Sequence, residues 1–128
     1  MSLRTQLQGT GAALVTPFTT DLQVDFDSLG KVIDAMILGG VEYLVTLGTT
    51  GETPTLDKQE KLDIANYTFE KVAGRVPVVV GIGGNNTADL IKDLHKFPLT
   101  KDVAVLSASH SYNQPSQEGI CDHYKALA

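Results

Sequence analysis

Four short apolar runs alternate along this chain with four segments of helical periodicity. The runs cover residues 12–16, 43–47, 77–82 and 103–106, and they begin about thirty residues apart. Each run is followed by a segment whose apolar residues recur every three or four positions, which is typical of a helix with one buried face. Strands that alternate with helices in this way form a parallel sheet whose strand ends share one edge. We therefore expect an α/β fold of four parallel βα units.

Residues that begin and end helices stand at the expected boundaries. Asp25 is expected to cap the first helix, and the glycines at 39–40 to end it. Asp57 with Glu60 has the spacing of a capping box, which predicts the start of the second helix. The expected caps of the third and fourth helices are Thr87 and Ser116. The continuous apolar run 12–16 predicts a strand buried on both faces, whereas residues 1–9 show no clear period.

Two architectures fit this alternation, namely a doubly wound open sheet and part of a (β/α)8 barrel. A complete barrel typically needs about 250 residues, and this chain has 128. It could therefore supply only the N-terminal half of a TIM barrel. The fourth helix also runs to Ala128 without a capping glycine, which we interpret as truncation. We expect residues 1–128 to form a single incomplete domain.

Composition narrows the possible functions. A formal net charge of −5 argues against a nucleic-acid or anionic-membrane partner. Cys121 is the only cysteine, so no internal disulfide can form and a reducing, cytoplasmic compartment fits best. No apolar run approaches the roughly 20 residues of a membrane span. The three histidines lack metal-ligand spacing, and we expect no metal site.

The run 43–47 ends in Gly-Thr-Thr-Gly-Glu at 48–52, which places Thr49 and Thr50 at the carboxyl edge of the predicted sheet. This edge is where α/β proteins bind ligands. The motif could be a simple turn with glycines at positive φ. It lacks the Gly-Lys-Ser/Thr of a phosphate-binding loop, and two hydroxyls beside backbone N–H groups suit a small carboxylate. Tyr112, in the loop after the fourth run, belongs to the same edge.

Several motifs, taken in order, resemble the dihydrodipicolinate synthase family, within the superfamily of N-acetylneuraminate lyase and other class I pyruvate aldolases. They are Ala-Leu-Val-Thr-Pro-Phe at 13–18, Val-Asp-Phe at 24–26, the motif at 48–52 and Tyr-Asn-Gln-Pro-Ser-Gln-Glu-Gly at 112–119. The resemblance implies a (β/α)8 barrel, commonly a homotetramer, that condenses pyruvate with aspartate semialdehyde to 4-hydroxy-tetrahydrodipicolinate in diaminopimelate and lysine biosynthesis. It also implies a pyruvate Schiff base on a lysine of the sixth strand, with no metal or organic cofactor.

The resemblance also implies roles for individual residues. Thr49 matches a threonine that relays protons between two tyrosines, and Thr50 matches the one that binds the pyruvate carboxylate. Tyr112 matches a tyrosine that reaches across a dimer interface. The second tyrosine, an arginine for the semialdehyde and the Schiff-base lysine are expected beyond Ala128. We therefore expect this chain alone to be inactive.

A lysine feedback site is implied at Asn85, Asp89 and Ser111. Lys58 and Lys61 take positions that are often histidine, and extra ammonium groups would disfavour a cationic effector. We expect weak or absent lysine inhibition.

Two alternatives stay open. Because sialic acid lyases usually carry serine in place of Thr49, the sequence favours a synthase, although another pyruvate aldolase of the superfamily remains possible. A non-enzymatic flavodoxin-like binding domain would also fit the length.

Overall fold

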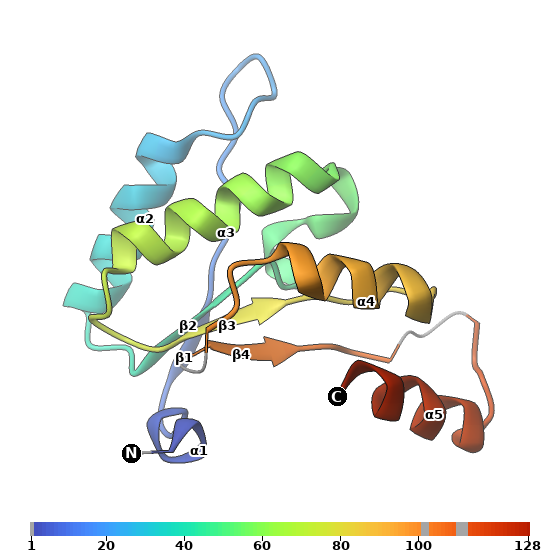
Figure 1. The fold of residues 1–128 in the computed structure, drawn as a ribbon. Helices are drawn as coiled ribbons and strands as arrows, with labels where there is room; N and C mark the ends of the chain where they lie inside the picture. Colours follow the sequence, from blue (N-terminus) through green and yellow to red (C-terminus); the bar gives the residue numbers. More distant parts are fainter. Residues whose placement is uncertain (1, 101–102, 110–112) are drawn as a thin grey trace.

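The computed structural model describes residues 2–100, 103–109 and 113–128. In this part of the chain, four strands form one sheet, and five α-helices and two 3-10 turns accompany them (Figure 1). The strands are β1 (Gly11–Ala13), β2 (Tyr43–Thr46), β3 (Val78–Gly81) and β4 (Val103–Leu106). The helical elements are α1 (Leu3–Gln6), α2 (Phe26–Leu38), η1 (Thr49–Gly51), η2 (Thr53–Thr55), α3 (Lys58–Val72), α4 (Thr87–Lys96) and α5 (Gln117–Leu127).

The order of the strands decides between the two architectures. They lie in the order β1-β2-β3-β4, and each neighbouring pair is parallel. A doubly wound sheet of the flavodoxin type reverses its strand order at the first strands, and the described sheet has no such reversal. The prediction of four parallel βα units is confirmed, and the flavodoxin-like alternative is wrong.

The hydrophobic core lies between one face of the sheet and the helices α2, α3 and α4, which cover that face (Figure 1). Leu44 and Val80 point into it from the two central strands, and both are fully buried. The helices contribute Leu29, Ile33, Ile64, Ala65 and Leu90. The carboxyl ends of the central strands are thereby fixed by packing on the helices behind them.

The expectation that residues 12–16 are buried on both faces is wrong. Leu14 and Thr16 are 3% and 6% exposed, but Val15 between them is 46% exposed. The described helices cover one face of the sheet, so alternate side chains of this segment point away from the core. The paired strand, Gly11–Ala13, also ends earlier than the expected run 12–16.

Most of the predicted helix boundaries are confirmed. Asp25 caps α2, and Asp57 forms a complete capping box with Glu60. Ser116 caps α5, accepting a hydrogen bond from the Gly119 N–H. The expected cap at Thr87 is wrong, since Asn86 takes that position and Thr87 is the first helical residue. Residues of the expected lead-in form the short helix α1.

Candidate functional site

The polar turn 48–52 follows β2 directly and contains the two predicted site threonines. Its backbone is left-handed at Leu47 (φ 57°) and at Glu52 (φ 55°), while residues 49–51 form the 3-10 turn η1. Gly48 has a φ of −79°, and Gly51 is not at positive φ either. The turn interpretation with glycines at positive φ is therefore wrong. A leucine in the left-handed region costs about 1–2 kcal/mol, so packing around it must hold this conformation.

Gly51 packs tightly against the end of the first strand segment. A Cβ atom there would lie 3.3 Å from the hydroxyl of Thr16 and 3.4 Å from the carbonyl oxygen of Leu14. The Thr16 hydroxyl donates a buried hydrogen bond of 2.7 Å to the Gly51 carbonyl oxygen. Thr16, at the end of the first strand segment, therefore holds the C-terminal end of the turn 48–52, which is called the threonine turn below.

Thr49 and Thr50 are both exposed at the carboxyl edge of the sheet. Thr49 lines a hollow of about 440 Å³. The segments that follow three of the strands line this hollow. They contribute Gly48 after β2, Gly83 and Gly84 after β3, and Ala108 after β4. The structure thus brings the predicted turn together with the ends of β3 and β4, as parallel topology requires.

The predicted feedback-site residues are only partly described. Asn85 lines a second hollow, of about 180 Å³, with Ser109 and Asn113 of the loop after β4. Asp89 does not line this hollow, and its carboxylate is bound by the Asn86 amide at 2.9 Å and by Lys92 at 3.5 Å. Ser111 and Tyr112 lie outside the described residues.

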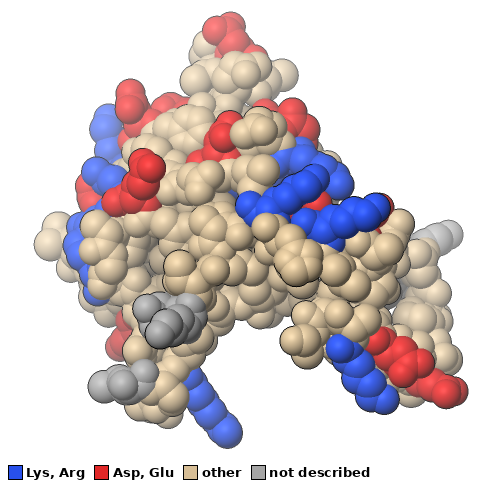
Figure 2. Space-filling view, in the orientation of Figure 1, with Lys and Arg blue, Asp and Glu red and all other residues tan. Residues whose placement is uncertain are grey.

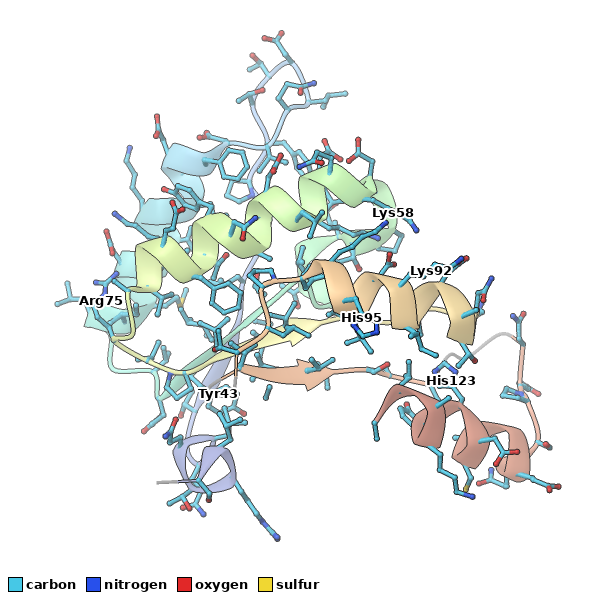
Figure 3. All side chains as sticks on the ribbon, in the orientation of Figure 1. Tyr43, Lys58, Arg75, Lys92, His95 and His123 are labelled. Carbon is cyan, nitrogen blue, oxygen red and sulfur yellow. The ribbon has the colours of Figure 1, made fainter. Side chains whose placement is uncertain are left out.

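Lysine side chains gather on the face formed by α3 and α4 (Figure 2). Lys58 projects from α3 toward α4 (Figure 3) and pairs with Asp93 at 3.3 Å. Lys61 and Asp93 both line the hollow that contains Thr49. The positive charge of Lys58 is therefore offset by the carboxylate of Asp93, which the sequence analysis did not identify as its partner.

A second ion-pair group, away from the strand ends, joins α2 to the end of α3. Asp34 accepts from Arg75 at 2.8 Å and from Lys71 at 2.9 Å. These bonds, the Arg75 bond foremost, hold the pKa of Asp34 below its ordinary value. The Ser28 N–H and hydroxyl likewise lower the pKa of Asp25 at the start of α2.

Metal ligation and membrane insertion have no structural support in the described residues. Within them, no three His, Cys, Asp or Glu side chains group closely enough to hold a metal ion. Over the same residues, no helix is both long and apolar enough to cross a membrane.

Four parallel strands in sequential order, with helices on their outer face, define this chain as part of a (β/α)8 barrel. The model of the dihydrodipicolinate synthetase family matches residues 6–128, and the chain belongs to this family. The resemblance seen in the sequence motifs is confirmed.

Named relatives support the assignment. The 4-hydroxy-tetrahydrodipicolinate synthase of Parabacteroides distasonis is 48% identical over 122 residues, which are 95% of this chain and 41% of that protein. The crystal structure of the chloride-inhibited dihydrodipicolinate synthase of Acinetobacter baumannii complexed with pyruvate aligns with a TM-score of 0.86 at 33% identity, covering 94% of this chain and 42% of that one. A structure of a monomeric dihydrodipicolinate synthase variant aligns with a TM-score of 0.88 at 36% identity, covering 96% and 41%. This chain thus spans about two fifths of the length of these relatives.

Sequence reasoning missed two residues that shape the site. Thr16 was interpreted only as the end of a strand, although a polar residue closing an apolar run is a weak signal for a hydrogen-bonding role. Gly81 lay inside the predicted strand 77–82 and was given no structural role, although it is the last residue of the observed strand. Both act through contacts between segments about thirty residues or more apart, which no local pattern reveals.

Proposed function

We propose that this chain supplies one wall of the active site of a 4-hydroxy-tetrahydrodipicolinate synthase, a lyase that condenses pyruvate with aspartate semialdehyde. The observation that carries the proposal is the turn holding Thr49 and Thr50, which lies at the catalytic edge of the sheet in a chain of this family. A relative with 33% identity and a TM-score of 0.86 was crystallised with pyruvate, which supports pyruvate as the first substrate.

The turn has the donors that a carboxylate needs. The N–H groups of Thr49 and Thr50 open the 3-10 turn and donate to no other described residue. Together with the two exposed hydroxyls they form a small group of hydrogen-bond donors that could bind a carboxylate. We assign the pyruvate carboxylate to Thr50 and proton relay to Thr49, with Tyr112 as the next group in the relay.

The covalent step belongs to a lysine outside residues 1–128. Seven of the eight lysines of this chain lie on α2, α3, α4 or α5, and Lys101 lies outside the described residues. None of the described lysines stands at a strand end, where a desolvated amine could form the imine. The chemistry then uses no metal or organic cofactor. We further propose a cytoplasmic, homo-oligomeric enzyme in the route to diaminopimelate and lysine, in which residues 1–128 alone are inactive.

Substitutions in a full-length synthase that carries this segment test the proposal. Thr50→Val should raise the KM for pyruvate about tenfold or more, because it removes a hydrogen bond to a charged group. Thr49→Val should lower kcat instead, by about 10²-fold or more, as expected for lost proton transfer. Thr55→Val is the matched control, since Thr55 is an exposed threonine of the next turn whose hydroxyl donates to the Glu52 carbonyl at 2.8 Å. Unchanged constants in both site variants would contradict the proposal.

Another pyruvate aldolase of the same superfamily is the second candidate. Thr49 favours the synthase, and the relative from Parabacteroides distasonis carries the synthase name. Turnover of pyruvate with aspartate semialdehyde, compared with turnover of pyruvate with a sugar aldehyde, separates the two activities.

A further inference from the structure

The buried hydroxyl of Thr16 is the strongest feature near the site that the proposed function does not use. Thr16 is 6% exposed and lies beyond the paired part of β1. Its hydroxyl donates to the Gly51 carbonyl oxygen at 2.7 Å. No other described residue donates a hydrogen bond to that carbonyl oxygen. This bond joins two segments that are 35 residues apart in the sequence.

The bond acts on the turn that contains Thr49 and Thr50. Gly51 is the last residue of η1 and is buried, whereas the two threonines before it are exposed. The turn is short, so the position of the Gly51 peptide fixes the direction in which the preceding N–H groups and hydroxyls point. Leu47, which directly precedes the turn, is 4% exposed and has a left-handed backbone conformation. Both ends of the turn are therefore fixed, one by packing and one by the Thr16 hydroxyl.

The geometry points to Thr16 as a positioning residue for the substrate carboxylate, acting through Gly51 on the donors of Thr50 and Thr49. This inference rests on the proposed function, because it assumes that the threonine turn binds the pyruvate carboxylate. Preorganised donors bind an anion without paying to reorder the loop, so loosening the turn weakens binding even though no contacting group is lost. Loss of the Thr16 hydroxyl should therefore affect pyruvate more than aspartate semialdehyde.

The test compares two threonine-to-valine substitutions in a full-length synthase that carries this segment. Thr68 on α3 provides the matched control, since it is fully buried and its hydroxyl also donates at 2.7 Å to a carbonyl oxygen, that of Ile64. Both substitutions remove one buried hydroxyl of the same kind and should lower thermal stability. Only Thr16→Val should raise the KM for pyruvate, by about tenfold, because only its partner belongs to the turn. Thr16→Ser keeps the donor and should restore a KM near that of the parent enzyme.

Each outcome decides the inference. A pyruvate KM that rises equally in Thr16→Val and Thr68→Val, or that Thr16→Ser fails to restore, would show a general loss of stability and overturn it. If Thr16→Val does not fold, Thr16→Ala and Thr16→Ser supply the same comparison. Thr50→Val and Thr49→Val separate the two proposals. An effect in these variants with none in Thr16→Val contradicts only the positioning role, whereas unchanged constants in both Thr50→Val and Thr49→Val contradict the proposed function itself.

Discussion

The carbonyl oxygen of Leu47 occupies the space that a Cβ atom on Gly81 would need. Leu47 leaves β2 in the left-handed region just before the threonine turn, and Gly81 is the last residue of the neighbouring strand β3. The missing side chain of Gly81 therefore allows the strained backbone of Leu47 to lie against the sheet. Gly81 of β3 thus influences the direction in which the threonine turn leaves the neighbouring strand β2.

Replacing Gly81 by alanine should destabilise the fold by about 1–3 kcal/mol, because the added methyl group meets backbone that cannot rotate away. Gly83→Ala is the control two residues further on, where a Cβ atom would lie 3.9 Å from the Ala108 carbonyl oxygen and 4.0 Å from the Ala108 amide nitrogen. Urea unfolding of the two variants measures the difference. Equal midpoints would contradict the role assigned to Gly81.

The ion pairs of Asp34 should make stability depend on acid pH. Its pKa is lowered, so the carboxylate stabilises the folded state above about pH 4 and loses that contribution as the pH falls through its folded-state pKa. Asp34→Asn should therefore lower the unfolding midpoint at pH 7 and have little effect at strongly acid pH. Asp63→Asn, at an exposed aspartate that accepts from the Gln59 amide at 2.8 Å, is the control. If the difference in unfolding midpoint between Asp34→Asn and the parent protein grew toward acid pH, this prediction would be contradicted.

Inhibition by lysine should be weak or absent in a full-length enzyme that carries this segment. Asp93 offsets the charge of Lys58, but Lys61 on the same helix has no ion-pair partner among the described residues. The ammonium group of Lys61 adds positive charge to this face and would disfavour a cationic effector nearby. Steady-state assays with added lysine measure the effect. An inhibition constant below about 1 mM, equivalent to about −4 kcal/mol of binding, would contradict this prediction.

Borohydride reduction in the presence of pyruvate should leave residues 1–128 unlabelled. The described lysines lie on helices, mostly exposed, where an ammonium group is not desolvated enough to form an imine readily. Intact-mass spectrometry detects the adduct, and a full-length synthase treated in parallel should gain one label. A stable adduct on any lysine of this chain would refute the assignment of the imine to another segment.

Residues 1–128 should associate in solution when produced alone. The sheet has β1 and β4 at its edges, and Val15, Val105 and Leu106 are 46%, 39% and 50% exposed. Unpaired strand edges with apolar side chains favour pairing between chains. Light scattering should show oligomers, and Leu106→Lys should reduce them. A monodisperse monomer at all concentrations would show that these edges are protected.

Local patterns predicted the elements of this fold well. The capping box at Asp57 and Glu60 and the cap at Ser116 were predictable because they join residues three positions apart. The cap at Asn86 was missed by one residue, since threonine is also a residue type that caps helices, although asparagine is preferred. The structure uses that threonine instead to contact His123 on α5, with its hydroxyl 2.7 Å from Nδ1.

The amino-acid sequence alone indicates the alternation of strands and helices, the sheet edge on which the threonines lie, and the family, because periodicity, caps and ordered motifs are local to the chain. The strand order, the exposed face at Val15, and the contacts of Thr16 with Gly51 and of Leu47 with Gly81 become visible only in the folded structure. These features depend on which segments meet after folding. Such close packing of backbone segments depends on the whole sheet and on the helices that cover it. The residues of a single segment are therefore not enough to predict these contacts.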